Sequence, residues 1–233
     1  LHLFTHAFFK ALLFLSAGSV MMGMHHNQDM RYMGGLRKYM PITHWTSLAG
    51  TLALIGMPFF SGFYSKDGII EALHYSNQPM AHIAYGAALL SVFVTAFYSL
   101  RVYFRVFWGP ERYDQNPDAH HDAHDDHGHH GNSHPHESPW VVTVPLVLLA
   151  IPSVLIGFFT MRPIVFGNFF QNVIHVDLHR HPALEKMAEE FHGSFAMALH
   201  SISTAPFWMM VAGIALAFVL YVGKNNMAHR IRH

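Results

Sequence analysis

Five apolar segments constrain what this chain can fold into. They cover about residues 1–24, 43–75, 79–108, 140–160 and 207–222. A helix of about 20 apolar residues crosses the roughly 30 Å hydrocarbon core of a bilayer. Lipid cannot satisfy unpaired backbone groups, so apolar segments of this length cross as helices. The pattern predicts an all-α, polytopic membrane helix bundle with about five transmembrane segments, embedded in the lipid bilayer.

The composition agrees with a membrane protein and excludes several classes of partner. Hydrophobic residues make up 52% of the chain, charged residues 12%, and the formal net charge is zero. This balance predicts no nucleic-acid partner. There is no cysteine, which excludes disulfides and thiolate metal sites. The chain starts at Leu1, already inside an apolar run, and we expect it to be the C-terminal part of a longer protein.

The second apolar segment, 43–75, is too long for one straight membrane helix. Its 33 residues would span roughly 50 Å at 1.5 Å per residue. Pro58, Ser61 and Gly62 lie in its middle and favour a break there. We therefore expect a discontinuous helix, interrupted between Pro58 and Lys66. The alternative is one complete span followed by an amphipathic helix on the membrane surface.

The basic residues indicate how often this segment crosses. If it crosses once, nine basic residues share one side of the membrane and three share the other. The larger set is Arg31, Arg37, Lys38, Arg101, Arg105, Arg112, Lys224, Arg230 and Arg232, and the smaller is Arg162, Arg180 and Lys186. Two crossings would divide them evenly. The positive-inside bias favours the single crossing and places the larger set in the cytoplasm.

A histidine-rich stretch divides the chain. We expect 1–110 to form one helical unit, 111–139 a low-complexity cytoplasmic loop, and 140–233 two further helices with a polar outward loop and a basic tail. Residues 114–138 are rich in His and Asp, a composition that cannot build a packed core. They should lack regular structure, and weak binding of a divalent metal remains the alternative.

Lys10 lies within the first apolar segment. An ionisable group inside a membrane span costs roughly 2.5–3.5 kcal/mol on insertion scales, which points to a function. His2, His6 and Lys10 are four residues apart and therefore share one helix face. Histidine titrates near neutral pH, and a lysine in a medium of low dielectric loses its proton more readily than in water. The pattern predicts stations for proton transfer. The alternative is a lysine that extends to the membrane interface.

Lys66 follows the predicted break and is followed directly by Asp67. The ends of half-helices leave backbone groups free to hold ions or water. Lys66 is therefore a second candidate for proton transfer, with Asp67 as its possible partner. An interfacial Lys–Asp pair at the start of an outer helix is the alternative.

Three stretches at these positions carry a resemblance to a known family. They are HAFFKALLFL at 6–15, MGGLRK at 33–38 and GMPFFSGFYSKD at 56–67. Their order and spacing are similar to those in the antiporter-like subunits of respiratory complex I, the proton-translocating NADH–quinone oxidoreductase. The resemblance is specific through about residue 110. Beyond that, only the helix pattern agrees, and the histidine-rich insert departs from the family's usual pattern.

The resemblance implies that residues 1–110 are part of the second antiporter-like repeat, with buried lysines, and it implies roles for the candidate residues. Lys10 would relay protons from the central axis of the membrane, His2 and His6 would link it onward, and Lys66 would be the lysine of the broken helix, near the proton exit. It further implies a subunit of an enzyme whose redox chemistry occurs elsewhere. Flavin, iron–sulfur clusters and quinone would belong to partner subunits, with no cofactor or metal in this chain. The partners would be other membrane subunits of complex I, and the location a bacterial inner membrane.

Other functions remain open at this point. A large subunit of a Mrp-type sodium/proton antiporter, or of a membrane-bound hydrogenase relative, shares the fold and the lysines. A divalent-metal transporter would need carboxylate or imidazole ligands in the membrane, where this chain carries lysines that repel cations. A membrane subunit without transport activity is the remaining alternative.

Overall fold

The computed structural model describes residues 1–113, 134–167, 169–170, 173 and 182–222. Over these residues the chain forms helices and no strands, which confirms the all-α prediction. The α-helices are α1 (His2–Gly23), α2 (Pro41–Ile55), α3 (Ser61–His74), α4 (Ala81–Tyr103), α5 (Trp140–Met161), α6 (Pro182–Glu190), α7 (Ser194–His200) and α8 (Ala205–Tyr221). Short 3₁₀ turns are η1 (Met30–Tyr32), η2 (Leu36–Lys38) and η9 (Ser201–Ser203), and π-helical turns are η3 (Phe104–Trp108) and η7 (Arg162–Phe166).

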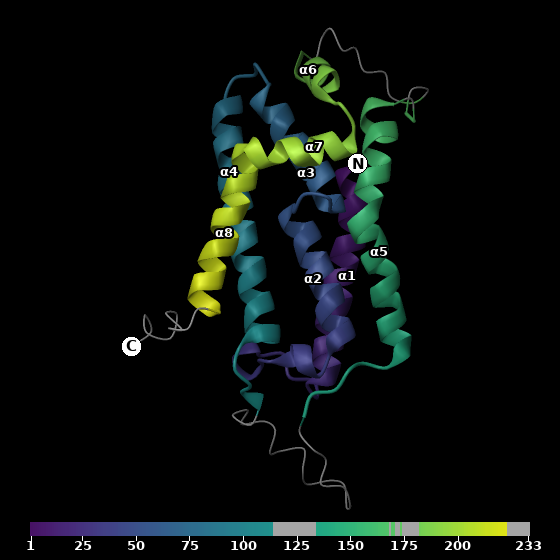
Figure 1. Ribbon diagram of the computed structural model, residues 1–233, viewed down its shortest axis with the longest axis vertical. Coiled ribbons are helices and arrows are strands. Elements are labelled where there is room, and N and C mark those ends of the chain that lie inside the picture. The colour runs from purple at the N-terminus through teal and green to yellow at the C-terminus, as the bar shows by residue number, and fades with distance from the viewer. Residues whose placement is uncertain (114–133, 168, 171–172, 174–181, 223–233) are drawn as a thin grey trace, which may run out of the picture.

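The long helices stand side by side in a bundle (Figure 1). Helix α1 packs against α2 and α5, and α4 packs along α8. Helices α2 and α3 follow one another through the centre and contact both α4 and α5. Helix α7 lies across the upper end of the bundle in Figure 1, and α8 descends from it beside α4. The broken helix is thus enclosed by α1, α4 and α5.

Three helices are long and apolar enough to cross a membrane on their own. They are His2–Gly23, Ala81–Trp108 and Trp140–Phe166. Ser194–Ser203 and Ala205–Tyr221 meet at 68° and would make a fourth span if they act as one. Helices α2 and α3 have 15 and 14 residues, each short of a full crossing. The second apolar segment therefore needs both half-helices to reach across.

The break between these half-helices covers residues 56–60. Gly56, at φ 82°, closes α2 in the left-handed conformation that glycine adopts without steric cost. The N–H of Met57 donates to the carbonyl of Leu52 at 3.0 Å, which completes a Schellman motif. Phe59 also has a left-handed backbone, φ 73°, an uncommon conformation for a non-glycine residue. A discontinuous helix is confirmed.

The position of the break differs from the prediction. Ser61 and Gly62, which we expected inside the break, form the first turn of α3, and Lys66 lies within that helix. The chain leaves the helix at Gly56, before Pro58 is reached, and re-enters it at Ser61. The backbone of Gly62 packs directly against the carbonyl of Ala53, and a Cβ at Gly157 of α5 would lie 2.6 Å from the Cα of Ser61. Close packing on both sides holds the interruption in place.

The two half-helices cross the bundle once (Figure 1). Helix α2 begins at the end where α1 finishes, and α3 ends where α4 begins. Among the described residues, the basic set at the first of these ends is Arg31, Arg37, Lys38, Arg101, Arg105 and Arg112, and the set at the other is Arg162 and Lys186. We call the first the basic end. This arrangement agrees with the single crossing inferred from charge.

Residues 134–138, which belong to the predicted unstructured insert, pack against the basic end. Glu137 accepts hydrogen bonds from the backbone N–H groups of Ile42 (2.7 Å) and Thr43 (3.3 Å), so it caps the first turn of α2. The hydroxyl of Ser19 on α1 bonds both Thr43 (2.6 Å) and Ser138 (2.8 Å). These five residues form no helix, as predicted, but they have fixed partners. Residues 114–133 lie outside the described part of the chain.

Replacement of Glu137 by alanine should destabilise the fold by about 1 kcal/mol, because it removes the acceptor for the free N–H groups of α2. A thermal melt of the purified protein in detergent measures this as a lower Tm. Glu189→Ala, at an exposed position of α6, serves as the control and should leave Tm unchanged. Deletion of 116–132 should also leave Tm unchanged. If Glu137→Ala, Glu189→Ala and the deletion all lowered Tm equally, the capping role of Glu137 would be contradicted.

Candidate functional site

The predicted polar face of α1 exists, and its three members have different surroundings. The rings of His2 and His6 are neighbours, with centroids 5.7 Å apart. His6 also packs edge-on against Phe9. Lys10 lies one turn further along on an exposed part of α1, with its ammonium 5.0 Å from the centre of the Phe14 ring. The structure therefore brings the two histidines together and leaves Lys10 on the outer surface of the described bundle.

A buried hydroxyl pair connects α1 to α3. His2 Nδ1 lies 3.0 Å from the Oγ of Ser65, and the hydroxyl of Thr5 donates to the same Oγ at 2.8 Å. Thr5 and Ser65 are 0% and 4% exposed. The Ser65 hydroxyl also lies 3.3 Å from the carbonyl of Gly62, so its single proton has two acceptors, that carbonyl and His2. Thr5, Ser65 and His2 therefore form one hydrogen-bonded group between α1 and α3, and Lys66 is the next residue of α3.

Lys66 faces a small cavity at the helix break. The Cδ of Lys66 lies against Gly56: a Cβ added to this glycine would be 3.8 Å from it. The cavity has a volume of about 20 Å³, enough for one water molecule. Its lining includes Gly56, Pro58 and Phe63 from the broken helix, together with both Lys66 and Asp67. Lys66 and Asp67 thus line the same small cavity.

The ends of the half-helices shape the electrostatics of this cavity. The carboxyl end of α2, which carries a partial negative charge, meets the stem of Lys66 and favours a cation there. Within the described residues, the ion pairs are Arg31–Asp29 and Lys38–Glu111, both near the basic end. Lys66 and Asp67 therefore adjoin the same cavity without forming a direct ion pair with each other.

Polar side chains continue from Asp67 towards the end of the bundle opposite the basic end. Asp67 and Glu71 are one helical turn apart on α3, so they share a face. Tyr75, which follows the last turn of α3, donates its hydroxyl proton to Glu190 of α6 at 2.7 Å. Carboxylates at this spacing provide successive acceptors between the cavity and the surface.

Sequence reasoning missed Thr5 and Ser65. Each is adjacent in sequence to a predicted residue, His6 or Lys66, but hydroxyl residues are common in membrane helices and their partners depend on how the helices are rotated. No group of three or more histidine, aspartate or glutamate side chains in the described ranges is placed to hold a metal ion. The expected absence of a cofactor in this chain remains a prediction.

Comparisons with known proteins relate this geometry to a family. A sequence model described as "NADH:quinone oxidoreductase/Mrp antiporter, TM" matches residues 1–95, which contain α1, the broken helix and the cavity. NADH-quinone oxidoreductase subunit L of Neisseria meningitidis serogroup A is 56% identical over 99% of this chain and 34% of its own length. NAD(P)H-quinone oxidoreductase chain 5 of Synechocystis is 40% identical over 94% of this chain and 35% of its own.

A third relative extends the range of organisms. NADH-ubiquinone oxidoreductase chain 5 of Chondrus crispus is 43% identical over 67% of this chain and 22% of its own length. The chain spans about a third of the length of the bacterial relatives just described. These relatives are all named as quinone oxidoreductase subunits, so the antiporter alternative is not favoured. The chain belongs to the antiporter-like membrane subunits of the NADH:quinone oxidoreductase family, among the proteins named subunit L or chain 5.

Proposed function

We propose that this chain forms part of the proton-translocating membrane region of an NADH–quinone oxidoreductase. Protons move through lysine and histidine side chains and water, driven by quinone reduction in other subunits. The observation that carries the proposal is the hydrogen bond between His2 and Ser65, the residue that precedes Lys66, together with the water-sized cavity that Lys66 lines in a broken membrane helix.

The chemistry of the linked groups suits proton transfer. Histidine gains and loses a proton near neutral pH, and a hydroxyl can accept one proton while it releases another. Lysine is a compact charge whose protonation state responds strongly to burial. In this proposal, protons pass from the face of α1 that carries Lys10 through His6, His2 and Ser65, and then through water to the cavity lined by Lys66 and Asp67. Asp67 and Glu71 offer the next acceptors towards the opposite end.

The proposal also places the chain in its surroundings. Its partners would be the other membrane subunits of complex I and the lipid bilayer, and flavin, iron–sulfur clusters and quinone would reside in other subunits. The basic end would face the cytoplasm of a bacterial cell, with the helices crossing the inner membrane. The end at which α3 meets α6 would then face outward and release protons.

Replacement of Ser65 by alanine should lower proton pumping by about tenfold, since one relay group is lost. The measurement is acidification of proteoliposomes that contain the complete oxidoreductase, after addition of NADH and quinone. Ser65→Thr retains the hydroxyl and should preserve most of the activity. Ser91→Ala is the control, because the Ser91 hydroxyl bonds only within its own helix among the described residues.

The two alanine variants separate transport from stability. Both should assemble into the complex to wild-type levels, as native electrophoresis would show. Normal pumping by an assembled Ser65→Ala enzyme would exclude the hydroxyl link between His2 and Lys66.

A further inference from the structure

Two buried titratable side chains, His44 and Tyr103, lie together at the basic end of the broken helix. Resting on the proposed function, we propose that His44 and Tyr103 form a proton-uptake station that supplies the Lys66 cavity from the basic end, along the interface of α2 and α4. This route is separate from the face of α1 that carries His2, His6 and Lys10.

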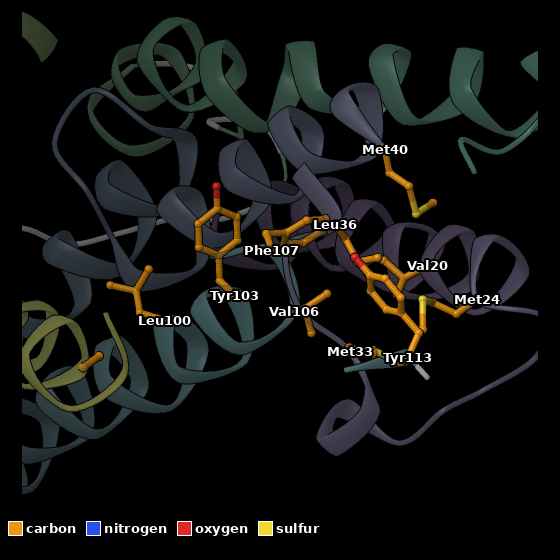
Figure 2. Close-up of a cluster of buried hydrophobic side chains, with 11 residues drawn as sticks. Val20, Met24, Met33, Leu36, Met40, Leu100, Tyr103, Val106, Phe107 and Tyr113 are labelled. Atoms are coloured by element: carbon orange, nitrogen blue, oxygen red, sulfur yellow. The ribbon is translucent and has the colours of Figure 1, made fainter. Parts of the chain in front are cut away.

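The pair is built with defined geometry. The Tyr103 hydroxyl lies 3.1 Å from His44 Nδ1 and 3.4 Å from Nε2, and the two rings stack with centroids 5.6 Å apart. His44 is 6% exposed and Tyr103 5%. Phe107 packs on both rings, with its ring centroid 5.3 Å from that of His44 and 5.3 Å from that of Tyr103. Figure 2 shows Tyr103 and Phe107 within the hydrophobic cluster that closes the basic end.

The position of the pair suits proton uptake. His44 lies one turn into α2, so it is close to the basic surface. Arg37 of η2 stacks on Trp108, with 4.0 Å from its guanidinium to the ring centre, and is the charged residue that acts electrostatically on His44. Tyr103 directly precedes the π-helical turn η3. Such turns free backbone groups from the regular ladder and occur often at functional sites.

Polar groups lead from this pair into the bundle. On α2, Ser47 and Thr51 follow His44 at spacings of three and four residues and are buried. On α4, Ser99 lies one turn from Tyr103, and its buried hydroxyl has no hydrogen-bond partner among the described residues. A buried hydroxyl of this kind is a natural position for a bound water. These groups cover much of the roughly 17 Å of helix rise between His44 and Ile55.

An apolar cluster separates these groups from the cavity. It contains Ile55, Ile70, Val92, Ala96 and Met210, and all of them except Ala96 also line the cavity at Lys66. A continuously hydrated path would let protons return without work, so a pump needs such a barrier. In this arrangement protons collect at His44 and Tyr103, and they reach Lys66 only when water briefly enters the cluster.

Replacement of His44 by glutamine tests the proposal, because glutamine can hydrogen-bond to Tyr103 but cannot titrate near neutral pH. In proteoliposomes with the complete oxidoreductase, we expect pumping to fall by about tenfold. The pH profile of pumping should also lose the inflection that a titrating histidine contributes. His82→Gln, at an exposed position at the other end of α4, is the control and should change neither.

Tyr103→Phe is the second variant and keeps the ring and its packing. It should lower pumping in the same assay, and it decides the matter if His44→Gln prevents assembly. An ordinary core histidine predicts a lower Tm with a wild-type pH profile, and that result in an assembled variant would overturn the proposal. Normal His44→Gln pumping with impaired Ser65→Ala would refute this uptake route alone, whereas normal pumping in both would refute the proposed function as well.

Discussion

Lys66→Ala should reduce proton pumping by about tenfold or more, because it removes the titrating group beside the helix break. The cavity next to Lys66 holds about one water, and Asp67 and the link through Ser65 are the proposed neighbours in the transfer. Without the Lys66 amine, a proton would have to cross the cavity with no basic side chain in its lining to accept it. Pumping and NADH–quinone turnover are measured together in proteoliposomes with the complete enzyme.

Two controls distinguish this effect from simple damage to the fold. Lys186→Ala removes an exposed lysine of α6 and should leave pumping at the wild-type level. The Lys66→Ala complex should assemble, because the side chain has no ion-pair partner among the described residues and its stem makes only van der Waals contact at Gly56. An assembled Lys66→Ala enzyme that pumps normally would remove Lys66 from the proposed path.

The broken helix could be predicted from length, but its position could not. A straight helix of 33 residues would be longer than the hydrocarbon core is thick, which indicated an interruption somewhere in 43–75. Pro58, Ser61 and Gly62 drew the prediction to an interruption between Pro58 and Lys66, whereas α2 already ends at Gly56. Glycine within an apolar helix often serves packing, so its left-handed role became visible only with the Schellman hydrogen bonds around it.

Sequence spacing predicts which site residues are neighbours within one helix, but not which residues meet between helices. The spacing of His2 and His6 follows from helix geometry alone, and their rings are indeed neighbours. The partnership of His2 with Ser65, 63 positions away, depends on the rotation of α1 against α3. Local spacing carries no information about that rotation. His44 and Tyr103 were missed because single polar residues in apolar helices give no periodic signal.

Composition likewise overstated the extent of the unstructured insert. The His/Asp-rich pattern treated 114–138 as uniform, but Glu137 and Ser138 make specific hydrogen bonds to α1 and α2. A carboxylate that caps a helix 95 residues earlier in the sequence cannot be recognised from its neighbours. Capping by a distant residue needs the tertiary structure, whereas a local cap can be read from the sequence.

Lys10→Arg should lower proton pumping by about tenfold, because guanidinium stays protonated at every working pH and cannot release a proton to the next group. The exposed position of Lys10 makes this variant informative. Its ammonium lies over the Phe14 ring, and arginine makes the same kind of cation–π contact at least as well. An anchoring role would therefore survive the change to arginine.

Lys10→Ala and Phe14→Leu complete the experiment. Alanine removes both charge and titration, so it should impair pumping as arginine does, whereas Phe14→Leu weakens only the ring contact and should leave pumping near the wild-type level. A pattern in which Lys10→Arg pumps normally while Lys10→Ala and Phe14→Leu both lower the amount of assembled complex would identify Lys10 as an anchor. In that case the proton path would start at His6 and His2, and the cost of placing a lysine in the first apolar segment would be explained by its contact with Phe14.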